Sequence, residues 1–160
     1  MAIDLLILKT AREKNLMKVK FTIPGEPKGK GRPRVENHHG KSVTRTPDDT
    51  LVYENLIKAM YYQQCQRAQF PKGTPLEVRV MAYYSIPQSE SKKRQALMEC
   101  HQLRPMKKPD VDNVVKVILD SLNKIAYHDD AQVVDCMFRK FYSYQPRVVV
   151  TIQEAQEVTA

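Results

Sequence analysis

Residues 107–135 read KKPDVDNVVKVILDSLNKIAYHDDAQVVD and combine a helical pattern with a concentration of acidic residues. Pro109 disfavours helix before it, so Asp110 is expected at a turn or at a helix cap. From Val111 onward, apolar residues recur at helical spacing and fall on one arc of a helix. They are Val111, Val114, Val115, Ile118, Leu119, Leu122 and Ile125. The pattern therefore predicts an amphipathic helix that begins at about Val111.

The polar side of this helix carries Asp112 and Lys116 as i,i+4 neighbours, with Asp110 just before the first turn. Asp129 and Asp130 come after the helix, directly before a strand-like run. Carboxylates brought together repel one another unless they share a cation or a proton, and Mg²⁺ prefers such oxygen ligands. A nearby lysine suits phosphate chemistry, where it offsets negative charge in the transition state. The alternative is that Asp110 is an ordinary cap and Asp112–Lys116 an ordinary surface pair. The set as a whole favours a metal site if the next strand brings the acidic pair back along the helix.

Four segments resemble the RusA family of Holliday-junction resolvases. They are residues 108–113 with Lys116, residues 120–123, residues 128–133, and a basic segment rich in glycine and proline at residues 25–34. The resemblance extends over about residues 17–152. It implies a Mg²⁺-dependent nuclease site made of Asp110, Asp112, Asp130 and Lys116, with Asp129 as the alternative third metal ligand.

The same resemblance implies an endodeoxyribonuclease of DNA recombination and repair that acts on four-way junctions, including enzymes of phage or prophage origin. It also implies a homodimer, since paired symmetric nicks require two sites related by a two-fold axis. A non-catalytic basic DNA-binding protein is the alternative, in which the aspartates are only caps and surface pairs. A glycosyltransferase with an Asp-x-Asp metal site is disfavoured, because the chain is short and the lysine and acidic pair would be unexplained. An EF-hand is excluded, because Val114, Val115 and Ser121 occupy positions that its ligands and glycine require.

Composition points to a polyanionic partner. The 160 residues predict one domain, and 26 Lys and Arg against 18 Asp and Glu give a net charge of +8. An acidic cluster in such a basic chain suggests a cation between protein and phosphate. Cys65, Cys100 and Cys136 form no CxxC pair, so a reducing cytoplasm is expected, with no zinc site or disulfide framework. No apolar run approaches the length of a membrane span, so no membrane partner is expected.

Residues 24–47 form a long basic stretch with four prolines. It lacks both the GxxxxGK[ST] and the GxGxxG patterns, so no nucleotide cofactor is expected. Because long loops in compact domains tend to be functional, this one is interpreted as a mobile arm that contacts the DNA backbone. A merely solvated loop is the alternative. The predicted DNA-contacting residues are Lys28, Lys30, Arg32, Arg34, Lys107 and Lys108.

The remaining patterns predict a single α+β domain over residues 17–153, with residues 1–16 as an appendage and residues 154–160 as a frayed tail. Period-two alternation predicts strands at residues 19–23, 76–86, 131–142 and 147–153, the last two paired as a hairpin. Helices are expected over about residues 48–69, capped by Thr46 or Asp48, within residues 88–104, and from residue 111. The order β-α-β-α-α-β-β describes a small mixed β-sheet with packed helices. Tyr53, Tyr61 and Tyr62 are interpreted as core residues rather than base-stacking platforms.

Overall fold

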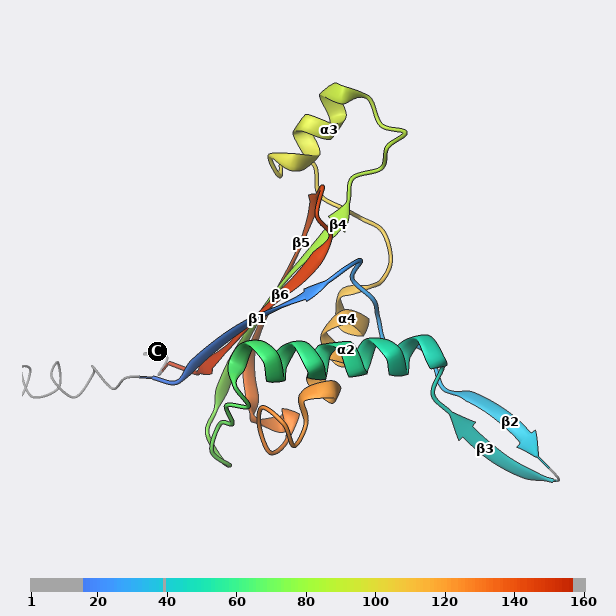
Figure 1. Cartoon of the computed structure of the whole chain (residues 1–160), viewed down its shortest axis with the longest axis vertical. Helices are drawn as coiled ribbons and strands as arrows, with labels where there is room; N and C mark the ends of the chain where they lie inside the picture. Colours follow the sequence, from blue (N-terminus) through green and yellow to red (C-terminus); the bar gives the residue numbers. More distant parts are fainter. Residues whose placement is uncertain (1–15, 39, 157–160) are drawn as a thin grey trace, which may run out of the picture.

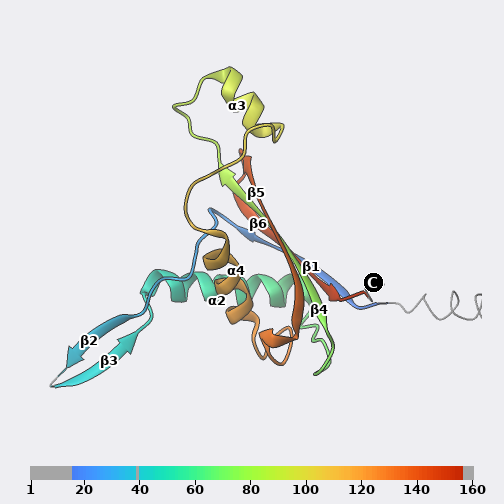
Figure 2. The same ribbon diagram turned by 180° about the vertical axis from the view of Figure 1, so that it is seen from behind.

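The computed structural model of the protein describes residues 16–38 and 40–156. Its centre is a four-stranded sheet in the order β1-β6-β4-β5, with α2 (Asp48–Cys65) and α4 (Val111–Leu122) on one side (Figures 1 and 2). The strands are β1 (Lys18–Pro24), β4 (Leu76–Ser85), β5 (Val133–Ser143) and β6 (Arg147–Glu154). β4 and β5 run parallel, and β6 is antiparallel to both β1 and β4. The predicted α+β class and mixed sheet are therefore confirmed.

Alternating side chains place the core between the sheet and the two helices. In β4 the members of one face are fully or almost fully buried: Leu76, Val78, Val80, Ala82 and Tyr84. Phe21 and Ile23 of β1 and Val148, Val150 and Ile152 of β6 continue this buried face. Full burial of one such aliphatic or aromatic side chain contributes about 1.5 to 3 kcal/mol. This core makes one face of the sheet the packing surface for α2 and α4.

Helix α4 has the amphipathic character that the sequence predicts, with a slightly different register. Its buried residues are Val114, Val117, Ile118, Ser121 and Leu122, whereas Val111 is 47% exposed. The helix ends at Leu122, where Asn123 is the C-cap and Lys124 adopts a left-handed conformation with φ 64°. Ile125 consequently belongs to the turn after the helix and packs there against the core.

Helix α2 begins without the expected side-chain cap. Pro47 occupies the N-cap position and no side chain accepts a capping hydrogen bond, so the prediction of Thr46 or Asp48 as cap was wrong. Proline at this position already holds the chain in an extended conformation before the helix. Tyr53 and Tyr61 are buried, as their interpretation as core residues requires, but Tyr62 is 41% exposed, so the interpretation was wrong for that residue. The helix ends at Cys65, four residues before the expected end near Gln69, because Gln66 turns left-handed with φ 51°.

The prediction that the last two strands pair as a hairpin was wrong. β4 lies between β5 and β6 and pairs with both of them. Alternation identifies each strand but not its neighbour, and β4 takes the central position because its buried face is the longest apolar one. β6 extends to Glu154, so the expected frayed tail does not begin there.

Residues 24–47 are less irregular than expected. They contain an antiparallel hairpin of β2 (Arg34–His38) and β3 (Lys41–Arg45), which projects away from the rest of the molecule (Figures 1 and 2). All five residues of β3 are exposed. The short basic helix α3 (Lys92–Glu99) begins after Ser91, whose side chain accepts a hydrogen bond from the Arg94 backbone N–H. The predicted appendage at residues 1–16 lies outside the described part of the chain, apart from Leu16. No helix among the described residues is long and apolar enough to cross a membrane.

Candidate functional site

The N-terminal end of α4 presents two carboxylates to solvent. Asp110 is the N-cap residue, but its side chain accepts no capping hydrogen bond, and both Asp110 and Asp112 are exposed. Among the described residues, neither carboxylate takes part in a hydrogen bond or an ion pair, so Asp112 and Lys116 form no surface pair. The alternative roles that the sequence suggested, a side-chain cap for Asp110 and a surface ion pair for Asp112, are therefore not observed.

The chain ahead of Asp110 is held in place by neighbouring strands. The Tyr84 hydroxyl donates to the Pro109 carbonyl at 3.3 Å, and Lys140 Nζ donates to the same carbonyl at 2.8 Å. Burial, followed by the charges of Glu26, Tyr53 and Asp110, raises the pKa of Tyr84 to about 12, which keeps this donor protonated. Sequence reasoning missed Lys140, although a lysine on the apolar face of a strand was an available signal. These contacts fix the start of α4 relative to β4 and β5.

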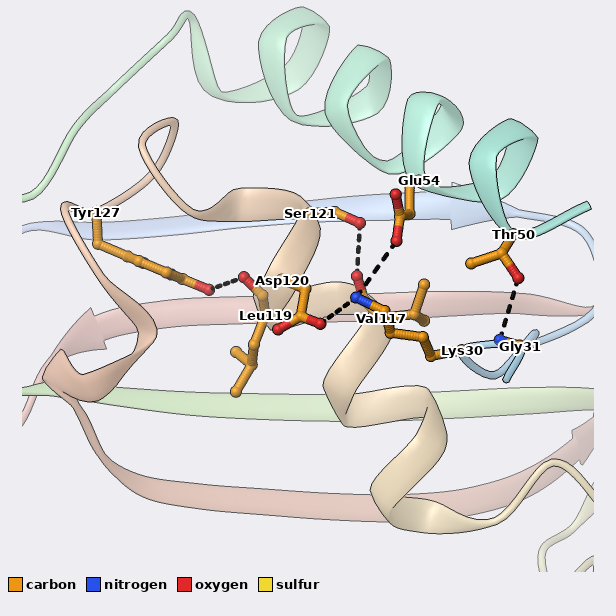
Figure 3. Close-up of polar contacts among 9 residues, drawn as sticks. All are labelled: Lys30, Gly31, Thr50, Glu54, Val117, Leu119, Asp120, Ser121 and Tyr127. Carbon is orange, nitrogen blue, oxygen red and sulfur yellow. Dashed lines mark hydrogen bonds and ion pairs between the residues drawn. The ribbon is translucent and has the colours of Figure 1, made fainter. Parts of the chain in front are cut away.

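Near the C-terminal end of α4, polar side chains are paired with other groups of the chain (Figure 3). Lys30 Nζ forms an ion pair with Asp120 and approaches Glu54 of α2 at 3.7 Å. The Ser121 hydroxyl donates to the Val117 carbonyl at 2.5 Å, and the Tyr127 hydroxyl donates to the Leu119 carbonyl at 2.8 Å. Polar groups at this end of the helix thus find partners within the chain.

The two members of the acidic pair behave differently. Asp129 is the N-cap of the short 3₁₀ helix η1 (Asp130–Gln132), and its Oδ1 accepts a hydrogen bond from the Ala131 N–H at 2.9 Å. That hydrogen bond lowers the pKa of Asp129. By contrast, burial, followed by the charges of Asp129 and Asp120, raises the pKa of Asp130. Asp129 therefore has a structural role, whereas no cation in the described part of the chain compensates the charge of Asp130.

Within one chain, Asp130 lies at the opposite end of α4 from Asp110 and Asp112. The Asp130 backbone N–H donates to Asn123 Oδ1 at 2.8 Å, directly after the helix. The 12 residues of α4 rise about 1.5 Å each, which separates its ends by about 18 Å. No group of three or more His, Cys, Asp or Glu side chains in the described residues is placed to hold a metal ion.

The topology explains this separation. β4 and β5 are parallel, so the connecting helix α4 must run antiparallel to both. A residue just before α4 then lies near the end of β4, and a residue just before β5 lies near the end of α4. The acidic pair does precede a strand beside the helix, as the sequence suggested, but that strand begins at the far end.

Most of the predicted DNA-contacting residues are accessible. Lys28, Arg32, Arg34, Lys107 and Lys108 are exposed. Lys30 is the exception, because its ammonium group is engaged with two carboxylates inside the protein. The arm therefore consists of a docked part around Lys30 and a projecting hairpin.

Comparison with known proteins defines the class of this protein. Residues 24–153 match the family described as endodeoxyribonuclease RusA, and they include every candidate site residue. The chain belongs to this family, so it is of a class of nucleases that act on DNA. One curated relative, the uncharacterized protein YqaN of Bacillus subtilis (strain 168), is 41% identical over 138 residues, which are 85% of this chain and 96% of that protein.

Proposed function

We propose that the protein is a Mg²⁺-dependent endonuclease that resolves four-way DNA junctions by paired, symmetric nicks during recombination and repair in the cytoplasm. The observation that carries this proposal is the pair Asp110 and Asp112 at the start of α4, two open carboxylates without partners among the described residues, in a basic chain of a DNA-nuclease family. Like charges held close together are costly unless a cation joins them. Their arrangement therefore suits a site completed by a ligand from outside.

The donor set fits Mg²⁺. This ion is commonly held by one or two carboxylates together with substrate phosphate oxygens and water. Asp110 and Asp112 supply two carboxylates, and the fixed Pro109 backbone restricts how they move. Asp130 is the proposed third ligand, because Asp129 is engaged as a cap.

In the proposed reaction, the chain holds and orients the phosphate. Bound Mg²⁺ would polarise the phosphodiester and assist attack by water. Lys116, exposed on the turn of α4 after Asp112, would place its ammonium group beside a phosphate oxygen and offset developing negative charge. Asn113 and Asp120 would act only by supporting the site, since both already contact the segment around Lys30.

We further propose that the active form is a homodimer in which Asp130 of one copy joins Asp110 and Asp112 of the other. The position of Asp130 at the far end of α4 supports this arrangement, because one chain does not bring the three carboxylates together. Two such sites related by a two-fold axis would account for paired nicks on a symmetric junction.

The projecting hairpin is the proposed DNA arm. A two-stranded ribbon fits the major groove of B-DNA, and β2 and β3 carry Arg34, Lys41 and Arg45. Arg34 and Arg45 face each other across the two strands, and Arg45 also forms an ion pair with Asp48. Replacing Lys28, Arg32 and Arg34 by alanine should weaken junction binding and reduce its salt slope by about 0.9 for each phosphate that is no longer neutralised. An unchanged affinity and slope would mean that this segment is only a solvated loop.

The function is tested by incubating purified protein with a four-way junction labelled on each strand. The expected result is a pair of symmetric nicks that appears with Mg²⁺ and not in EDTA, together with dimers in sedimentation. A non-catalytic DNA-binding protein would bind the junction and leave it intact under both conditions. Fully active monomers would contradict the dimeric arrangement.

A further inference from the structure

The segment around Lys30 is fitted closely between α2 and α4. The Lys30 N–H donates to the Asn113 carbonyl at 3.0 Å, and the Gly31 N–H donates to Thr50 Oγ1 at 3.1 Å. A Cβ atom at Gly29 would lie 3.0 Å from the Cβ atoms of Asn113 and Pro109. At Gly31 it would lie 2.6 Å from Thr50 Oγ1, a distance that real Cβ atoms essentially never show. The close approach therefore requires glycine at position 31, and it leaves little room for a side chain at position 29.

The Lys30 side chain joins the same two helices. Its ammonium group lies between Asp120 of α4 and Glu54 of α2 (Figure 3). The three side chains are only partly accessible, with 27% of Lys30, 26% of Asp120 and 16% of Glu54 exposed. Removing this cation would leave two neighbouring carboxylates uncompensated in a half-buried position, which is unfavourable.

Lys30 consequently stays charged and engaged. Burial lowers its pKa, but the hydrogen bond to Asp120 and the charges of Asp120 and Glu54 outweigh that effect, so its pKa is raised overall. Two carboxylates already compensate the charge of this ammonium group, which makes it less available to a phosphate than a lysine without such partners. This distinguishes Lys30 from the exposed Lys28 and Arg32 on either side.

The hairpin of β2 and β3 begins three residues after Gly31. One contact that its side chains make with the rest of the chain is the ion pair from Arg45 to Asp48 at the start of α2. That pair is largely exposed and contributes little to orientation. The hairpin is joined to the helices at two places: β3 leads into α2 through Thr46 and Pro47, and the incoming chain is held against α2 and α4 at residues 29–31.

We infer that Lys30 is a positioning residue, whose internal ion pairs with Asp120 and Glu54 hold the root of the β2–β3 hairpin against the helix that bears Asp110, Asp112 and Lys116. The hairpin and the phosphate site then face the same DNA in a fixed relation. This inference rests on the proposed function for its consequence in catalysis, whereas the positioning itself does not depend on nuclease activity.

The position of the hairpin is tested by spin-label distance measurements in the full chain. Labels are placed at Thr44→Cys in β3 and Lys72→Cys in the turn before β4, both exposed positions, with Cys100 and Cys136 replaced by serine. Lys30→Met should broaden or shift the distance distribution, whereas Lys30→Arg should retain it. Lys93→Met on the exposed surface of α3 is the matched control and should leave it unchanged. An unaltered distribution in folded Lys30→Met protein would overturn the inference, whether or not the protein cuts DNA.

Catalysis and binding should separate in the same variant. Lys30→Met should lower the nicking rate at saturating junction about 10- to 100-fold, the range expected when a reacting group is misplaced by about 1 Å. Its salt slope for junction binding should equal that of the wild type. A slope reduced by about 0.9, with normal nicking at saturation, would make Lys30 a phosphate contact and overturn the inference.

A variant with the two charges exchanged distinguishes loss of the ion pair from loss of folding. Lys30→Glu and Asp120→Lys should each disturb the hairpin, while the double variant should restore the distance distribution and part of the nicking rate. Additive damage in the double variant, with a normal thermal unfolding transition, would show that the ion pair does not position the arm.

Discussion

The two ends of α4 carry similar acidic residues in opposite circumstances. At the C-terminal end, Asp120 is paired with Lys30, and Asn123 binds the backbone of Asp130. At the N-terminal end, Asp110 and Asp112 are exposed and have no hydrogen bond or ion pair among the described residues. Asp120 at the C-terminal end thus has a partner within the chain, whereas Asp110 and Asp112 at the N-terminal end are open to solvent.

This difference separates structural carboxylates from candidate ligands more sharply than residue type does. A carboxylate with an internal cation contributes to folding, and its loss should appear in stability. Exposed carboxylates without one, such as Asp110 and Asp112, contribute little to stability and are candidate ligands for a cation from solution. Substitutions at the N-terminal end should therefore lower nicking with little change in stability, whereas substitutions at the C-terminal end should lower stability.

The largest expected effect is that of Asp112→Asn. Mg²⁺-dependent nicking should fall more than about 100-fold, the loss typical of removing one group that stabilises transition-state charge. The free energy of unfolding should change by less than about 0.5 kcal/mol, as for other exposed sites. Junction affinity in EDTA should be equal to or tighter than wild type, because a negative charge facing a polyanion is removed. Nicking close to the wild-type rate would refute the metal site.

Mixing two inactive variants should restore cutting. When Asp112→Asn and Asp130→Asn proteins are combined in equal amounts and exchange subunits, about half of the dimers carry one copy of each. If Asp130 acts across the dimer, each mixed dimer has one intact site, which gives about a quarter of the wild-type sites. Single-strand nicking of the junction measures this recovery, and Mn²⁺ binding to the mixture followed by electron paramagnetic resonance provides a readout independent of activity. A mixture as inactive as its components would contradict a site in which Asp130 of one copy joins Asp110 and Asp112 of the other.

Lys116→Met should have a smaller effect on cutting than Asp112→Asn. We expect about a 10- to 100-fold loss of nicking, since one cation near the phosphate is removed while the metal ligands remain. Unlike the aspartate variants, it should show no gain of junction affinity in EDTA, because it loses a positive charge. Tighter binding by Lys116→Met would contradict a position beside the DNA.

At the other end of the helix, Asp120→Asn should act on stability. It leaves Lys30 half-buried beside Glu54 alone and should lower the free energy of unfolding by about 1 to 2 kcal/mol, between the values for exposed and buried pairs. Urea unfolding measures the change. Glu90→Gln, which removes the carboxylate from an i,i+4 pair whose arginine, Arg94, is 54% exposed, is the control and should cost less than about 0.5 kcal/mol. Equal losses in the two variants would remove the distinction between the ends of α4.

The smallest expected effect is a change in proton binding at Asp130. In metal-free protein its pKa should lie above the ordinary value of 3.8, and Asp120→Asn should bring it down by removing a neighbouring negative charge. Because the ionised form is disfavoured in the folded state, this residue destabilises the fold above its folded-state pKa. That penalty should be relieved as the pH falls through the folded-state pKa, and relief should be complete below about 3.8. Carboxylate NMR titration, with Asp130→Asn as reference, measures it, and a pKa at or below 3.8 would contradict the arrangement.

Much of the architecture follows from local pattern. Period-two alternation identifies β1, β4, β5 and β6, and helical spacing identifies α4, because side-chain direction repeats with the backbone geometry of each element. The same segment displays the carboxylates and Lys116 that define the candidate site. Charge composition and the basic segment before α2 point to DNA in the same way.

Only the tertiary structure decided which of these residues meet. The parallel pairing of β4 and β5 places Asp130 at the far end of α4, and the insertion of β4 between β5 and β6 replaces the expected hairpin. Lys30 looks like Lys28 and Arg32 in the sequence, yet it turns inward to Asp120, 90 residues away. Such choices depend on contacts between distant segments, and local spacing carries no information about which distant partner lowers the free energy of the whole chain.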